Sequence, residues 1–303
     1  MAVAEPRALP AAPGRARALR RLLAARGVAT GGALLAALLL GALFGPLLWG
    51  QDPAHIDLTA RNLGASPAHP LGTDQLGRDL LARLMAGARV SLAVGLSATG
   101  LALLIGTGVG LLAGMVRWLD APLMRLTDLC LALPLLPLLL LMMMLFRAPL
   151  AALTGPEGGM FLLMVAAIGL TSWMQIARLL RGEVLRLQAL EFTRAARALG
   201  VPPARLVARH ILPNALSPIL VSAAICLAQA ILTESALSFL GLGFPPDFPT
   251  WGRLLLEAID HLQTNPGRAL WPGGAITATV LGVTLLADGL TEALDPRRRT
   301  RVP

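Results

Sequence analysis

The segment EFTRAARALGVPPARLVARHILPNALSP, residues 191–218, decides how the remainder of this chain is interpreted. It gathers four arginines and a histidine in a chain that is 55% hydrophobic, and long apolar runs lie on both sides of it. Gly200 can end a helix in the left-handed conformation, and the prolines at 202 and 203 suit the start of a new helix. We therefore predict two short helices at an angle, the second over residues 203–210, placed between two membrane-spanning helices.

The composition of the flanking sequence is that of an integral membrane protein. Mean hydropathy is +0.69, and only 14% of the residues are charged, whereas about a quarter would be charged in a soluble domain. Apolar stretches of roughly 18 residues or more recur, and each is long enough to cross a hydrocarbon core of about 30 Å. The composition therefore predicts an all-α, polytopic membrane protein.

The apolar runs predict six transmembrane helices. They cover residues 31–49, 90–116, 126–146, 160–179, 215–241 and 273–294. The resulting organisation is a tail (1–28), a first transmembrane helix (29–50), an outer segment (51–88), a five-helix core (89–296) that contains the inner segment 191–213, and a second tail (297–303). A cleaved signal peptide is the alternative for the N-terminus, but the first apolar run is too long for its hydrophobic region.

The distribution of arginine predicts the orientation of these helices. Six arginines precede the first span, seven lie between residues 178 and 209, and four follow the last span. The proposed outer segments hold roughly balanced positive and negative charge. Because short cytoplasmic loops carry the excess of basic residues, both termini and the segment 191–213 are predicted to be cytoplasmic. Arginines that lie between apolar spans form no soluble basic face, so we expect no nucleic-acid partner.

Several catalytic functions are excluded by missing residues. The chain contains no lysine, so it can form neither a P-loop nor a lysine Schiff base. It also lacks the H-E-x-x-H and G-x-S-x-G motifs. Cys130 and Cys226 lie within apolar runs, and with four scattered histidines they predict no metal site. We expect a non-catalytic protein without a cofactor or metal, and ATP, if used, must be bound by another subunit.

The segment 191–213 also carries a pattern of apolar and basic side chains. The first short helix has a narrow apolar stripe formed by Phe192, Ala195, Ala196 and Leu199. The second is expected to present Leu206 and Val207 among basic residues. Two interpretations stay open from these residues alone. One is an apolar knob, rimmed by positive charge, that docks in a groove of another protein; the other is a basic loop that only anchors the topology.

The same segment resembles the EAA loop of ABC-importer permeases. The resemblance rests on Arg194-Ala195-Ala196, on Gly200 and on the run His210-Ile211-Leu212-Pro213. Two positions depart from the pattern, since arginine replaces glutamate at 194 and histidine replaces isoleucine at 210. In that family the loop forms the helix that inserts into the ATPase subunit. The resemblance implies a coupling role for Arg194, Ala195, Ala196, Gly200, Arg205, Leu206, Val207 and Pro213.

Further motifs are similar to the C-type subunit of dipeptide, oligopeptide and nickel importers. They are HPLGTDQLGRD (69–79) with GARVSL (87–92), the set Asp120, Arg125, Asp128 and Pro134, LSFLGLG (237–243) with Trp251-Gly252, and DGL (288–290) with LDPR (294–297). The resemblance covers residues 30–299. It implies a type I ABC-importer permease fold in a bacterial inner membrane, with membrane lipid around it. The implied partners are a second homologous permease, two ABC ATPase subunits and a periplasmic or lipid-anchored solute-binding protein.

Two acidic residues are candidates for the translocation path. Glu234 lies toward the outer end of the fifth predicted span, and Asp288 lies within the sixth. A charged side chain costs about 2.5–3.5 kcal/mol at the bilayer centre unless it is paired or faces water. A structural hydrogen bond and a location at the membrane interface are the open alternatives for both residues. The rival function is a self-contained secondary transporter, which would need a repeated architecture with an ion site near the midplane; no such repeat is visible.

Overall fold

The computed structural model describes residues 25–294. The predicted tail 297–303, and all but residues 25–28 of the predicted tail 1–28, lie outside this range. The described residues form the helices α2 (Arg26–Trp49), η1 (Leu58–Ala60), α3 (Leu80–Met115), α4 (Arg117–Ala132), α5 (Leu135–Gln188), α6 (Glu191–Ala198), α7 (Pro203–Leu206), η2 (Val207–Ile211), α8 (Leu212–Phe239), α9 (Trp251–Ala258), η3 (Ile259–His261) and α10 (Gly267–Leu294). They contain no β-strand, and the predicted all-α class is confirmed.

Five of the described helices are long and apolar enough to cross a membrane. They are α2, α3, α5, the continuous helix Pro203–Phe239 and α10. The difference from the predicted six arises in α5, which has 54 residues but is not one straight helix. Gly155 has φ 81° and ψ 164°, which is not a helical conformation. A Cβ on Gly159 would lie 2.6 Å from the backbone nitrogen of Ala151, although residues eight apart in a straight helix are separated by about 12 Å.

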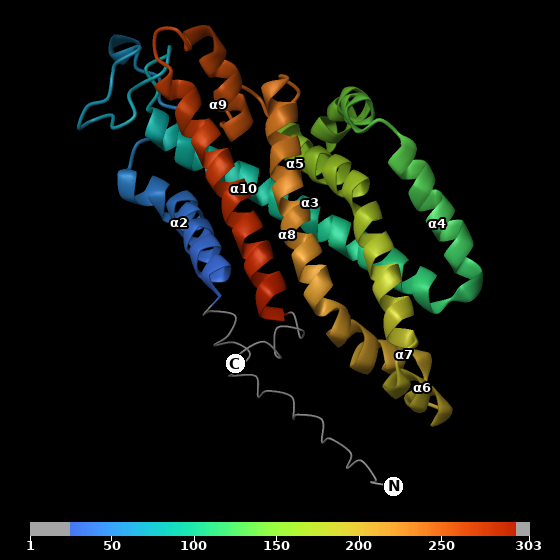
Figure 1. Ribbon diagram of the computed structural model, residues 1–303. Helices are drawn as coiled ribbons and strands as arrows, with labels where there is room; N and C mark the ends of the chain where they lie inside the picture. The colour runs from blue at the N-terminus through green and yellow to red at the C-terminus, as the bar shows by residue number, and fades with distance from the viewer. Residues whose placement is uncertain (1–24, 295–303) are drawn as a thin grey trace.

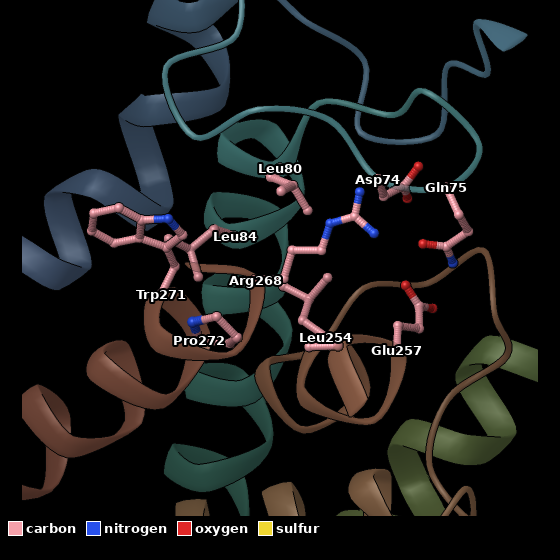
Figure 2. Close-up of a pocket in the computed structure, with 10 residues that line it drawn as sticks. Asp74, Gln75, Leu80, Leu84, Leu254, Glu257, Arg268, Trp271 and Pro272 are labelled. Carbon is pink, nitrogen blue, oxygen red and sulfur yellow. The ribbon is translucent and has the colours of Figure 1, made fainter. Parts of the chain in front are cut away.

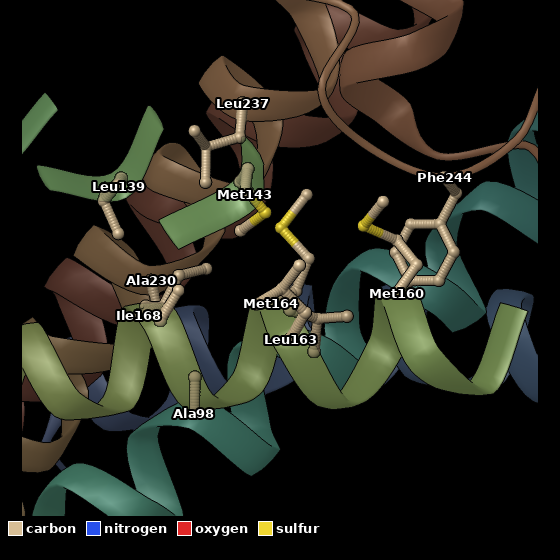
Figure 3. Packing of buried hydrophobic residues seen from close by; sticks show 12 residues of the cluster. Ala98, Leu139, Met143, Met160, Leu163, Met164, Ile168, Ala230, Leu237 and Phe244 are labelled. Atoms are coloured by element: carbon tan, nitrogen blue, oxygen red, sulfur yellow. The ribbon is translucent and has the colours of Figure 1, made fainter. Parts of the chain in front are cut away.

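The chain therefore folds back at Gly155, and α5 consists of two packed arms, residues 135–154 and 156–188. Buried side chains of both arms share one core cluster with α3 and α8. In this cluster Leu139 and Met143 of the first arm lie against Met164 and Ile168 of the second (Figure 3). The number of six spans stays a prediction, with α5 supplying two helices in place of one.

The third predicted span, residues 126–146, is not a continuous helix, and that prediction is wrong. Helix α4 ends at Ala132, Leu133 has an extended backbone with φ −73° and ψ 135°, and α5 begins at Leu135. Pro134 explains the interruption. A proline disfavours the helical conformation of the residue before it and has no N–H to continue the hydrogen-bond ladder.

The long helices lie alongside one another, and the loops gather at two ends (Figure 1). The segment between α2 and α3 and the short helix α9 lie at the upper end of the view, whereas α6 and α7 lie at the lower end. The start of α2 packs against the end of α10: a Cβ on Gly31 would lie 2.5 Å from the carbonyl oxygen of Gly282. Small residues permit this close helix contact. The start of the first long helix and the end of the last therefore both lie toward the end of the bundle that carries α6 and α7 (Figure 1).

Candidate functional site

The segment between α5 and α8 forms two short helices joined at Gly200. Helix α6 ends at Ala198, and α7 begins at Pro203 with proline in its first turn. Gly200 has φ 75°, so the predicted left-handed conformation is confirmed. A Cβ at this position would meet no heavy atom within 4 Å. The requirement for glycine here is therefore conformational and does not come from packing.

The second short helix does not end at His210 as predicted, because it continues into α8. Residues Val207–Ile211 form a π-helical turn, in which the N–H of Leu212 donates to the carbonyl of Val207. Pro213 follows directly, and it has no N–H to donate to the carbonyl one turn earlier. The wider π-helical turn allows the helix to continue through Pro213 without a break, as π-bulges do within α-helices. Residues Pro203–Phe239 consequently form one helical rod.

Leu206 does not project from the segment, and the sequence-based expectation was wrong on this point. Its side chain is 1% exposed and packs in a cluster with Leu180, Val184 and Leu187 from the end of α5. Val207 is half-buried against the same cluster. The turn between α6 and α7 folds back over the membrane helices, which directs Leu206 inward.

The exposed face of the segment is formed by other side chains. Phe192 of α6 is 44% exposed, and Leu199, the C-cap residue of α6, is 84% exposed, so both side chains are available to a partner. The predicted coupling residues Arg194, Ala195, Gly200, Arg205 and Pro213 are exposed, and Ala196 is half-buried. An apolar tip is therefore present, but it is centred on Leu199 at the C-terminal end of the first short helix, which also carries the exposed residues Arg194 and Arg197.

A groove of about 430 Å³ lies between α4, α5 and α8 within the apolar spans. Most of its lining is apolar, with residues such as Leu131, Leu135 and Met174. Its polar residues are three of α5 (Thr171, Ser172 and Gln175) and three of α8 (Ser222, Gln229 and Thr233), and no charged residue lines it. The hydroxyls of Thr171, Ser172 and Thr233 donate to carbonyls of their own helices at 2.7–2.8 Å. The side-chain amides of Gln175 and Gln229 make no hydrogen bond with the described residues, so they are free to bind water or a solute.

None of these groove residues was predicted from the sequence, where the candidates for the path are the charged residues Glu234 and Asp288. A signal for them does exist. Thr171 and Gln175 are four residues apart, as are Gln229 and Thr233, and Ser222 precedes Gln229 by seven. Such spacing places polar side chains on one face of an apolar helix. Polar residues at helical spacing inside a membrane span could therefore have identified both walls.

Glu234, one of the two predicted path residues, does not line this groove. Its carboxylate is fully buried and accepts a 2.7 Å hydrogen bond from the hydroxyl of Ser238. The hydroxyls of Ser91 on α3 and of Thr250, the N-cap of α9, also hydrogen-bond to it. The burial favours the structural alternative for Glu234, because the side chain joins three helices and reaches no open surface of the chain.

Asp288, the other predicted path residue, is exposed on α10. It lies near the C-terminal end of α10, and Glu234 lies near the C-terminal end of α8. These two helix ends lie at opposite ends of the bundle (Figure 1). The structure therefore does not bring the two acids together. Among the described residues, no group of histidine, cysteine, aspartate and glutamate could hold a metal ion.

A buried ionic network ties the segment before α3 to α9. Asp74 accepts hydrogen bonds from Arg78 Nε at 2.6 Å and from Arg83 Nη1 at 2.7 Å, and Arg83 also donates to Glu257 of α9 at 2.6 Å. Arg268 lies with its guanidinium toward Asp74 (Figure 2). Burial raises the pKa of the Asp74 carboxyl, but hydrogen bonds from Arg78 and the charge of Arg83 outweigh burial and hold that pKa below its ordinary value.

Comparisons with known proteins agree with this arrangement. The family model described as the binding-protein-dependent transport system inner membrane component matches residues 106–300. The N-terminal TM domain of oligopeptide transport permease C matches residues 15–65.

Three similar proteins illustrate the relationship. The dipeptide transport system permease protein of Alkalihalophilus pseudofirmus is 37% identical, over 88% of this chain and 84% of its own length. The oligopeptide transport system permease protein of Bacillus subtilis is 35% identical over the same shares. The glutathione transport system permease protein of Pectobacterium atrosepticum is 37% identical, over 81% of this chain and 78% of its own. The family-model match and the sequence identity over most of the chain show that this chain belongs to the family of binding-protein-dependent transport system inner membrane components.

Proposed function

We propose that this chain is the permease subunit of an ATP-driven, binding-protein-dependent importer in a bacterial inner membrane. It forms part of the translocation path and transmits movement from ATPase subunits through the segment 191–213. The relatives named as dipeptide, oligopeptide and glutathione permeases support this proposal. The chain itself supplies no catalytic group, so ATP hydrolysis belongs to partner subunits.

The observation that carries the proposal is the helical rod Pro203–Phe239. Its first turns lie beside the exposed tip of α6, and its middle turns carry Ser222, Gln229 and Thr233 along the groove between α4, α5 and α8. Leu206 and Gln229 are about 35 Å apart along this rod at 1.5 Å per residue. A displacement of the cytoplasmic end therefore moves a wall of the groove directly, without an intervening flexible loop.

The proposed partners follow from the movement of this helical rod. Two ABC ATPase subunits receive the coupling segments of this chain and of a second homologous permease, which supplies the other half of the path. A periplasmic or lipid-anchored solute-binding protein delivers substrate to the outer end. Closure of the ATPases on ATP pushes the segment 191–213, the rod tilts, and the path opens outward; release of the closed state returns it to the inward-open arrangement.

The groove chemistry favours small peptides as substrate. Amide and hydroxyl side chains both donate and accept hydrogen bonds, so they match the main-chain N–H and C=O groups of a peptide. The groove carries no formal charge, so it does not select strongly for the charge of substrate side chains. Di- and oligopeptides fit this description, and a related small solute such as glutathione or a nickel chelate is the alternative cargo.

Uptake by the reconstituted complex tests the proposal. Proteoliposomes with all subunits should import a labelled tripeptide only with ATP and binding protein. Gln229→Leu should lower uptake several-fold while the ATPases still co-purify, whereas Leu220→Ile, on an exposed part of α8, should leave uptake unchanged. Equal uptake by Gln229→Leu and wild type would exclude the groove as the path. Uptake by the chain alone along an ion gradient would instead support a secondary transporter.

A further inference from the structure

A second cavity, of about 640 Å³, lies at the cytoplasmic end predicted for the bundle. Its walls come from the end of α3, the start of α4, the end of α5 and the turn between α6 and α7. This volume is within the range of about 300–1,000 Å³ that small-molecule sites occupy. The cavity shares no lining residue with the groove between α4, α5 and α8 and plays no part in the proposed path.

Two arginines give this cavity a positive charge. Arg117 and Arg197 line it, and neither makes an ion pair or hydrogen bond with the described residues. The one acidic residue in the lining, Asp120, is neutralised by Arg181, whose Nη2 donates to it at 2.7 Å. Hydrogen bonding to Arg181 outweighs burial and keeps the pKa of Asp120 low, so this carboxylate stays ionised and paired. The free positive charge of the cavity therefore belongs to Arg117 and Arg197.

The cavity lies at the level where the membrane-spanning helices reach the membrane surface. It adjoins the last residues of the apolar helix α3, where the chain leaves the membrane-spanning stretch. Trp118 follows Arg117 and is 76% exposed. Exposed tryptophan at the end of a span is typical of the headgroup region. Helix α4 also begins beside the cavity without a side-chain cap, so backbone N–H groups of its first turn lack a side-chain acceptor.

From these features we infer that the cavity binds the headgroup of an anionic phospholipid. Arg117 and Arg197 pair with the phosphate, and the acyl chains extend along the exposed apolar side of the bundle beside Trp118. Basic pockets between membrane helices on the cytoplasmic side bind such headgroups. Because Arg197 belongs to α6 and Arg117 to α4, a bound lipid connects the coupling segment to the membrane helices. The inference does not depend on the transported substrate.

Native mass spectrometry of the purified full-length chain tests this inference. The delipidated protein is titrated with phosphatidylglycerol and, in parallel, with phosphatidylcholine. Wild type should prefer phosphatidylglycerol. Arg117→Gln with Arg197→Gln should lose roughly 25-fold in affinity for it, on the basis of about fivefold for each arginine near an anionic headgroup. The matched control, Arg125→Gln with Arg147→Gln, removes the same charge from exposed positions outside the cavity and should keep the preference.

Further arms distinguish the alternatives. Arg117→Lys with Arg197→Lys keeps both charges and should retain most of the preference, and the single variant Arg117→Gln should fall between wild type and the double variant. Equal binding of the two lipids by wild type, or an unchanged preference in the double glutamine variant, would overturn the inference. Displacement of phosphatidylglycerol by millimolar inorganic phosphate or ATP would show a site for a soluble anion and would also overturn it.

Discussion

The Ser238 hydroxyl donates a 2.7 Å hydrogen bond to the Glu234 carboxylate one turn earlier in α8, and Glu234 is fully buried. The same carboxylate reaches Ser91 of α3 and Thr250 at the start of α9. Close contact accompanies these hydrogen bonds, since a Cβ on Gly252 of α9 would lie 2.2 Å from the carbonyl oxygen of Ser235. Glu234 therefore fixes α9 against the start of α3 and the end of α8.

Replacement of Glu234 should consequently reduce stability before it affects transport. Glu234→Leu leaves several buried hydroxyls without their acceptor, at about 1–3 kcal/mol for each unsatisfied group. Glu234→Gln keeps one acceptor oxygen and should therefore lower the free energy of unfolding by less than Glu234→Leu does. Thermal unfolding in detergent measures both variants, with Glu157→Leu at an exposed position as the control. If Glu234→Leu had the unfolding temperature of wild type but reduced uptake, Glu234 would belong to the translocation path and would not have the structural role.

The Asp74 network predicts a loss of stability in acid. Since the pKa of Asp74 is held below its ordinary 3.8, the folded protein binds fewer protons than the unfolded chain at this site. The stabilisation is therefore present above that ordinary value and is lost as the pH falls through the lower, folded pKa. Asp74→Asn should unfold at a lower temperature than wild type near neutral pH. The difference in unfolding temperature between Asp74→Asn and wild type should become smaller as the pH falls below about 4.

Unfolding temperatures from about pH 6 to about pH 3 measure this effect. Asp52→Asn is the matched control, because Asp52 is exposed and contacts only the nearby backbone. A constant difference between Asp74→Asn and wild type over the whole range would contradict the assignment of the charge effect to Asp74.

The orientation predicted from arginine is tested by cysteine labelling. Both native cysteines, Cys130 and Cys226, are free and are replaced first. Single cysteines at the exposed positions Ala65 and Gln263 should then react with a membrane-impermeant thiol reagent in cells whose outer membrane, if present, has been permeabilised. A cysteine at Ala204, also exposed, should react only after the inner membrane is permeabilised. Labelling of Ala204 in intact inner membranes would reverse the orientation.

Those features that local chemistry determines could be predicted from the sequence. The membrane class follows from the length of the apolar runs, and the left-handed conformation of Gly200 follows from its place between α6 and a double proline. The break at Leu133 also has a local cause in Pro134, but the apolar run around it concealed the signal. Hydropathy measures whether a stretch can enter the membrane and not whether its helix is continuous.

The inward direction of Leu206 could not be predicted in the same way. A four-residue helix has no extended apolar stripe to mark its buried face, and the π-turn that follows rotates the residues after it. Its partners, such as Leu180 and Val184, lie on another helix, so the burial depends on tertiary contacts. Glu234 is similar, because two of its hydroxyl donors come from distant segments.

The Gly200 conformation leads to a prediction about coupling. Gly200→Val places a β-branched residue at φ 75°, at a cost of about 1–2 kcal/mol, which the chain can avoid by changing the angle between α6 and α7. This variant should reach the membrane but show little stimulation of ATP hydrolysis by loaded binding protein. Gly200→Asn is the control, since asparagine tolerates the left-handed region and no neighbour would meet its Cβ. If loaded binding protein stimulated ATP hydrolysis by the valine variant as much as by wild type, the segment 191–213 would only fix the membrane topology and would have no coupling role.

Leu199 and Leu206 allow the same substitution to be compared at an exposed and at a buried position of the segment 191–213. Leu206 is 1% exposed within the core, so Leu206→Ala should destabilise the chain by about 2–5 kcal/mol. Leu199 is 84% exposed, so Leu199→Ala should change stability by no more than about 0.5 kcal/mol and yet weaken co-purification of the ATPases. Thermal unfolding and ATPase recovery from the same preparations measure both effects. If Leu206→Ala unfolded normally and lost the ATPases while Leu199→Ala kept them, the docking surface would be centred on the second short helix after all.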